Sequence, residues 1–164
     1  MAISTIGQNG LQQSRILTAV QQPAGAVLQV VNVTYSTSIT TTSTTYVDTG
    51  LTASITPSSS TNKILVLVDM ADVGKSGGTG TGGYGKINIV RNSTQLIEIS
   101  KQYGYTGNTN PNSIGSVSSN YLDSPATTSS TTYKIQYALA GSNGTMEVNA
   151  SNGTSTITLM EIAA

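Results

Sequence analysis

The residues of this 164-residue chain that could do chemistry are its acids, lysines, hydroxyls and tyrosines, because it contains no His and no Cys. Without His there is no side chain that ordinarily titrates near neutral pH, and no imidazole ligand for a metal. Without Cys there is no thiolate nucleophile, no disulfide and no zinc-thiolate site. The composition therefore excludes most catalytic and metal chemistry before any spacing is considered.

Carboxylate catalysis needs two acids that converge on one substrate, and no spacing singles out a pair among the seven acidic residues. Asp69 and Asp72 follow an apolar stretch and are the weak candidates for a Ca²⁺ site, together with loop carbonyls. The alternative is two solvated charges near Lys63 and Lys75. Composition alone leaves glycosidase chemistry open, but the chain lacks the Trp and Phe that usually line such clefts. We expect no enzymatic activity, no bound cofactor and no metal.

Two glycine patterns look like phosphate-binding motifs. Gly78, Gly80 and Gly83 match GxGxxG, and Gly74-Lys75-Ser76 matches the end of a P-loop. Both motifs work by presenting backbone amides at the start of a helix, whereas the segment that follows, Tyr84–Arg91, alternates like a strand. We interpret Gly74–Gly85 as a glycine-rich loop between two strands.

The charges balance at seven basic and seven acidic residues, which gives no electrostatic footprint for nucleic acid. No run of about 18 apolar residues occurs, and the N-terminus lacks the basic and apolar regions of a signal peptide, so we expect neither a membrane span nor a signal peptide. Ser and Thr together number 48, and Ser, Thr, Tyr, Val and Ile outnumber Leu, Ala, Glu and Lys. This composition favours strands, because branched and aromatic side chains pack well on a pleated surface.

Residues 1–25 differ from the rest and are predicted to form an N-terminal arm, followed by one domain over residues 26–164. Leu11, Ile16, Leu17 and Val20 could form the apolar stripe of a short helix beside the isolated Arg15. A helix this short is marginal alone and would need a partner surface. The arm is thus a candidate site for binding another protein.

From Ala26 onward the sequence period is two, as in strands with one buried and one solvated face. Ile64–Val68 is apolar at every position, which indicates a central strand covered on both sides, by a second sheet and a neighbouring subunit. Short strands joined by turn residues, without helices or a long repeat, favour an all-β, two-sheet antiparallel sandwich of jelly-roll type. The predicted strands are Val27–Tyr35, Thr44–Asp48, Leu51–Thr56, Ile64–Val73, Tyr84–Arg91, Thr94–Ser100, Val117–Leu122, Thr132–Ala140, Thr145–Ala150 and Ser155–Ile162.

Tyr is the one aromatic residue type in the chain, and Tyr84, Tyr103 and Tyr105 fall in or beside long loops. Tyrosines in loops suit the recognition of sugars or protein surfaces, so these three are candidates for partner binding. For Tyr103 and Tyr105 the alternative, that the rings cap the sandwich, has equal weight. Tyr35, Tyr133 and Tyr137 alternate with polar residues and are predicted to lie in the core.

Three segments resemble a group of small β-sandwich virion proteins of tailed bacteriophages, prominent in aquatic and cyanobacterial phages. They are Tyr121–Gln136 (YLDSPATTSSTTYKIQ), Ser155–Ala163 (STITLMEIA) and Gly25–Val31 (GAVLQVV). The resemblance extends over roughly residues 25–164. Such proteins serve as capsid decoration (cement) proteins, head fibres or tail-fibre tips, and many virion jelly rolls are trimers. The resemblance implies no catalytic residues.

Two functions follow as hypotheses. The first is a capsid decoration protein on the virion surface, made in the host cytoplasm, a homotrimer bound to the major capsid protein through the arm and one edge of the sandwich. The second is a head-fibre or tail-fibre tip whose Tyr and Asn loops bind a host glycan or receptor. A third, weaker one is a non-viral extracellular adhesin or matrix subunit. The fold alone does not choose among them.

Overall fold

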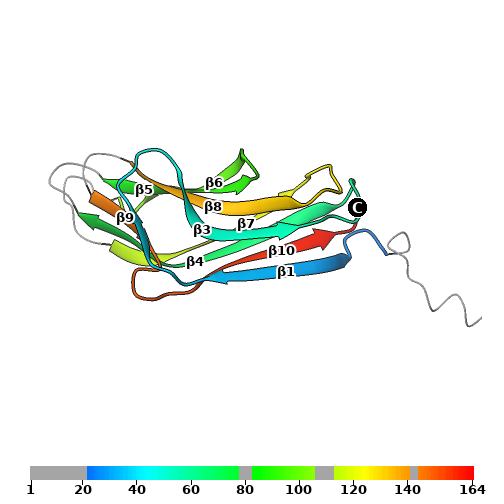
Figure 1. Ribbon diagram of the computed structural model, residues 1–164, viewed down its shortest axis with the longest axis horizontal. Coiled ribbons are helices and arrows are strands. Elements are labelled where there is room, and N and C mark those ends of the chain that lie inside the picture. The colour runs from blue at the N-terminus through cyan, green and yellow to red at the C-terminus, as the bar shows by residue number, and fades with distance from the viewer. Residues whose placement is uncertain (1–21, 78–82, 106–112, 141–143) are drawn as a thin grey trace, which may run out of the picture.

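The computed structural model describes residues 22–77, 83–105, 113–140 and 144–164. The arm candidates Leu11, Arg15, Ile16, Leu17 and Val20 lie outside these residues. Two antiparallel sheets pack face to face (Figure 1), which confirms the predicted all-β sandwich. The strands are β1 (Val27–Tyr35), β2 (Ile39–Thr41), β3 (Val47–Ile55), β4 (Lys63–Gly77), β5 (Tyr84–Arg91), β6 (Thr94–Tyr103), β7 (Ser113–Asp123), β8 (Thr131–Ala140), β9 (Gly144–Val148) and β10 (Ser155–Ile162).

Eight of these strands follow the jelly-roll arrangement. Sheet A runs β1-β10-β4, with β7 on the other edge of β4, and the short strands β9 and β2 continue it past the start of β10. Sheet B runs β3-β8-β5-β6. Every strand pair is antiparallel, and the first strand pairs with the last, so the start of β1 lies beside the end of β10 in sheet A.

The core lies between the inner faces of the two sheets. In β8, Tyr133, Ile135 and Tyr137 are buried, and the residues between them are partly exposed. Tyr35 packs against the same core from β1. The predicted core positions of these three tyrosines are therefore confirmed. The period of two is the physical reason, because a strand in a sandwich can bury every second side chain.

The four largest differences from the predicted strands concern β2, β3, β4 and β7. Thr44–Asp48 and Leu51–Thr56 were predicted as separate strands, but Val47–Ile55 forms the one strand β3 with an irregular register between Asp48 and Thr52. Gly50, in the left-handed region (φ 86°), makes this continuity possible, since a Cβ there would lie 2.5 Å from Cζ of Tyr35. The short strand β2 was missed, because its three residues show no recognisable alternation.

The other two differences concern β4 and β7. β4 continues through Gly74-Lys75-Ser76 to Gly77, so the predicted loop begins later than expected. β7 begins at Ser113, four residues earlier than predicted. A bulge between Met70 and Val73 lets β4 change neighbours from β10 to β9 on one edge.

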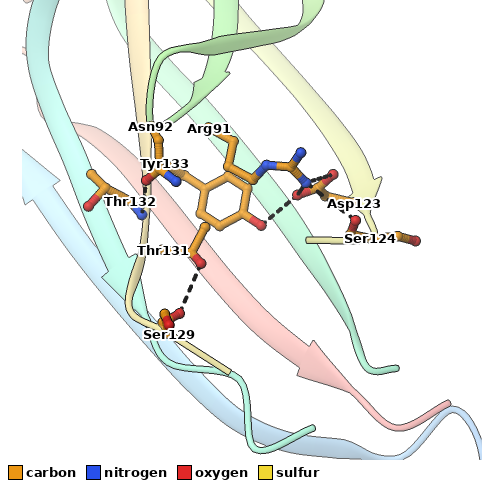
Figure 2. A network of polar contacts seen from close by, with 8 residues as sticks. All are labelled: Arg91, Asn92, Asp123, Ser124, Ser129, Thr131, Thr132 and Tyr133. Atoms are coloured by element: carbon orange, nitrogen blue, oxygen red, sulfur yellow. Dashed lines mark hydrogen bonds and ion pairs between the residues drawn. The ribbon is translucent and has the colours of Figure 1, made fainter. Parts of the chain in front are cut away.

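A buried carboxylate links the two sheets at one end of the sandwich (Figure 2). Asp123 ends β7 in sheet A, and its side chain receives hydrogen bonds from two residues of sheet B. Arg91 Nη1 donates to Oδ2 at 2.7 Å and to Oδ1 at 2.9 Å, and the Tyr133 hydroxyl donates to Oδ2 at 2.7 Å. Removing one partner from such a group leaves the others buried without compensation.

We expect Asp123→Asn to lower the free energy of unfolding by about 3 kcal/mol, because the partly buried Arg91 guanidinium and the buried Tyr133 hydroxyl lose the negative charge of their acceptor. Tyr133→Phe removes one hydrogen bond and is expected to lower it by about 1 kcal/mol. Lys134→Ala is the control, since its ion pair with Asp48 is at the surface and such pairs contribute about 0.5 kcal/mol. Urea unfolding measures all three, and equal effects of Asp123→Asn and Lys134→Ala would contradict the role of Asp123.

Candidate interaction surface

The outer face of sheet A carries a row of apolar side chains across four adjacent strands. Val30 of β1 pairs with Met160 of β10, Met160 pairs with Leu65 of β4, and Leu65 pairs with Leu122 of β7. Val30 is 55% exposed and Leu122 49% exposed, and the two between them are partly exposed. Because directly paired residues lie side by side on one face, the four side chains form a continuous ridge.

Beside this ridge the same face is hollowed. The next two rows carry shorter side chains, among them Ser118, Asn120, Thr156 and Thr158, and they enclose a hollow of about 330 Å³ next to Leu67 and Asp69. Two charges bound the region along β4, with Lys63 at one end and Asp69 at the other. We call this region the A face: Val27, Val30, Asn32, Thr34, Lys63, Leu65, Leu67, Asp69, Ser118, Asn120, Leu122, Thr156, Thr158, Met160 and Ile162.

The outer face of sheet B has the opposite character. A row across it joins Glu98, Asn88, Gln136 and Asp48, all polar or charged. These groups are held by each other and by neighbours: Lys134 Nζ and Gln136 Nε2 donate to Asp48, and the Tyr46 hydroxyl donates to Glu98 Oε1 at 2.5 Å. The buried Oδ1 of Asn88 in this row has no hydrogen-bond partner among the described residues. A polar face is nevertheless suited to water, whereas exposed contiguous apolar surface marks interaction sites. The A face is therefore the better candidate for binding protein.

The buried carboxylate of Glu161 connects several segments at the Lys63 end of the A face. Glu161 is fully buried on the inner side of β10 and accepts hydrogen bonds from Ser58 N (2.6 Å), Asn62 Nδ2 (2.6 Å) and Gln29 Nε2 (2.5 Å). Burial alone would raise its pKa, but the hydrogen bonds from Asn62, Gln29 and Ser58 outweigh burial and lower the pKa. Glu161 thereby ties β10 to β1 and to the turn before β4.

The structure separates the two acids that were candidates for a Ca²⁺ site. Asp69 is exposed on the A face and accepts a hydrogen bond from Ser118 Oγ at 2.8 Å. Asp72 lies in the bulge of β4 with a positive φ of 45°, and its carboxylate lies against Gly153. Within the described residues, no three acidic side chains are close enough to hold a metal ion. This geometry gives no support to a Ca²⁺ site at Asp69 and Asp72.

The candidate tyrosines fall into two environments. Tyr84 and Tyr105 meet edge to face with ring centroids 6.1 Å apart, and Tyr105 is 55% exposed. Tyr103 instead packs on the core, and its hydroxyl donates to the carbonyl of Val73. Burial raises the pKa of Tyr103. Tyr84 and Tyr105 thus lie together as a possible recognition site, while the ring of Tyr103 supports the fold.

The P-loop lookalike is part of a strand. Gly74, Lys75 and Ser76 all lie in β4, and Tyr84–Arg91 is strand β5, as the alternation predicted. Lys75 is 1% exposed, and its Nζ donates to the carbonyl of Gly83 at 3.0 Å. Gly78–Gly82, which hold the first two glycines of the GxGxxG pattern, lie outside the described residues.

Sequence reasoning missed the A face itself. Its one signal was the apolar run Ile64–Val68, from which cover on both sides was predicted. The inner residues Ile64, Val66 and Val68 are buried, but Leu65 and Leu67 remain partly exposed within this single chain. Val30, Leu122 and Met160 looked like isolated apolar residues in the sequence, because the pairing that gathers them joins strands far apart in the chain.

No protein-family model matches the chain, and no curated protein matches it. Among solved structures, it is similar to a chain of the infectious bursal disease virus VP2 subviral particle, with 12% identity and a TM-score of 0.44, over 83% of this chain and 38% of that chain. It is also similar to a chain of the infectious bursal disease virus Gx strain, with 12% identity and a TM-score of 0.44, over 86% and 39% of the two chains. This chain thus spans less than two fifths of either, and similarity this low indicates no function. Within the described residues no helix is long and apolar enough to cross a membrane.

We expect Glu161→Gln to lower the free energy of unfolding at pH 7 by about 2 kcal/mol, because an amide accepts the surrounding hydrogen bonds less well than a carboxylate. The effect should depend on pH. Since folding lowers the pKa of Glu161 below its ordinary value of 4.5, its contribution is complete above that pH and is lost as the pH falls through the folded-state pKa.

Urea unfolding of both proteins at pH 7 and in acid tests this expectation, and the difference between them should shrink in acid. Glu147→Gln is the control, because this partly exposed acid accepts a side-chain hydrogen bond from Ser38 alone among the described residues, and we expect a change of about 0.5 kcal/mol or less. An equal Glu161→Gln effect at both pH values would contradict the ionised state of Glu161.

Proposed function

We propose that this chain is a non-enzymatic structural protein of a virion, and that it decorates and stabilises the outer surface of a capsid. The observation that carries the proposal is the edge strand β1. Its nine residues include no charge and no proline, and β10 is its one strand partner in the described structure. Edge strands of monomers are usually protected by charge, proline or shortness, so an unprotected one suits pairing with another protein.

The rest of the exposed surface supports a permanent rather than a catalytic role. Most outward positions carry Ser, Thr or Asn, whose burial against protein is less unfavourable than burial of charge. The arm precedes β1 directly, so the arm and this edge can form one continuous attachment site for the major capsid protein. The resemblance to phage virion proteins agrees with this role. Copies of the chain also associate with one another in this proposal.

Capsids assembled with and without the protein test the proposal. We expect the protein to occupy the capsid surface and to raise the temperature at which capsids open and release DNA. Removal of residues 1–21 should reduce occupancy, because the arm is part of the attachment site, and Tyr105→Ala should leave occupancy unchanged. Occupancy is measured by quantitative mass spectrometry of purified capsids. No occupancy by the full chain, or the same opening temperature with and without it, would contradict the role.

The alternative is a fibre tip that binds a host glycan or receptor, and the edge-to-face pair Tyr84 and Tyr105 favours it. An exposed aromatic pair offers a flat apolar surface on which a sugar ring can lie. In that case Tyr105→Ala should reduce adsorption of phage to host cells at least tenfold, whereas Tyr103→Phe, which keeps the packed ring, should not. Capsid stability would then be unaffected by either variant. Adsorption unchanged by Tyr105→Ala would exclude this pair from receptor binding.

A further inference from the structure

The A face has features that match a second copy of itself. The A face lies on β1, β10, β4 and β7, and Lys63 and Asp69 are its charged residues. They have opposite sign and lie three residues on either side of Val66, on the same face of β4. Among the described residues neither belongs to an ion pair. A face with one charge of each sign at equal distances from its centre can neutralise both charges by meeting a copy of itself.

Two copies can stack their A faces in two ways. In each, a two-fold axis lies between the two copies, parallel to their A faces. If the axis runs along β4, Lys63 meets Lys63 of the other copy, and like charges oppose each other. If the axis runs across the strands, β4 lies antiparallel over its copy, and Lys63 meets Asp69 at both symmetry-related positions. Electrostatics therefore selects the second orientation.

The same orientation also matches shape. Position 65 of one copy then lies over position 67 of the other, so the apolar ridge lies over the row formed by Asn32, Thr158, Leu67 and Asn120. That row borders the hollow of about 330 Å³ beside Asp69. The longer side chains of each copy thus enter the space left by the shorter side chains of the other. Two sheets packed in this way form an aligned sandwich like the one inside each subunit.

We infer that two copies of this chain associate face to face through the A face, with Leu65, Met160 and Leu122 in the centre and Lys63 opposite Asp69 at both ends. Four strands and seven residues give a flat footprint of about 450 Å². Stable complexes bury about 800 Å² per partner, so the association is expected in the micromolar range. The inference goes beyond the proposed virion role and can hold or fail independently of capsid binding.

A contact with two-fold symmetry is complete when two copies have met. The inferred assembly is therefore a dimer, whereas the sequence predicted a homotrimer. Sedimentation equilibrium of the purified full chain at concentrations up to about 500 µM tests this, with a dimer expected. A monomer throughout that range, or a trimer, would overturn the inference. Capsid occupancy is a separate measurement, so failure of the capsid role leaves this result unaffected.

Charge reversal tests the orientation. Lys63→Glu and Asp69→Lys each oppose like charges at two symmetry-related positions, and each is expected to weaken association about tenfold. The double variant K63E/D69K restores opposite charges and should recover the wild-type dissociation constant within about threefold. Lys101→Glu is the matched control, because it makes the same charge change at an exposed position away from the A face and should have no effect. A double variant as weak as the single ones would overturn the proposed orientation.

The apolar centre is tested with Leu65→Thr and Leu122→Thr together, since threonine is compatible with an exposed strand. We expect association to weaken by more than tenfold while the circular dichroism spectrum and thermal unfolding of the monomer stay unchanged. Association that is unaffected in this folded variant would overturn the inference.

Discussion

The apolar contact between the inner faces of the two sheets is the interaction on which the rest of the structure depends. Each strand presents every second side chain to this core, and Ile64, Ile87, Ile135 and Leu159 are among those with no exposed surface. Neither sheet could bury its inner face alone. The buried carboxylates of Asp123 and Glu161 add hydrogen bonds at the ends of this contact. Each accepts hydrogen bonds from other strands or turns and so holds those segments in place.

The sandwich leaves two outer faces, and their difference is the basis of the functional argument. Sheet B carries a polar row on its outer side, whereas sheet A carries an apolar ridge there. The edge strand β1 adds unprotected backbone groups beside that ridge. The proposed contact with other proteins rests on this difference between one polar and one apolar outer face.

Much of the fold could be predicted from the sequence, because alternation is a local property. The bounds of β1, β5 and β10 agree with the predicted ranges, and the tyrosines of β8 lie in the core as expected. Failures occurred where a distant residue decides the local structure. Gly50 looked like a turn between two strands, but it continues β3 beneath the ring of Tyr35. Lys75 fell in a predicted loop, but it lies in β4, and its Nζ donates to the carbonyl of Gly83.

The sequence by itself determined what chemistry is absent and which elements form, since both depend on residue types and on a period of two. It excluded imidazole and thiol chemistry and indicated a sandwich of short strands. Only the tertiary structure decided which side chains become neighbours. Val30, Leu65, Leu122 and Met160 come from four strands spread over the chain, and long-range antiparallel pairing brings them into one row. Such pairing is set by the packing of whole sheets, so no local pattern reveals the surface it creates.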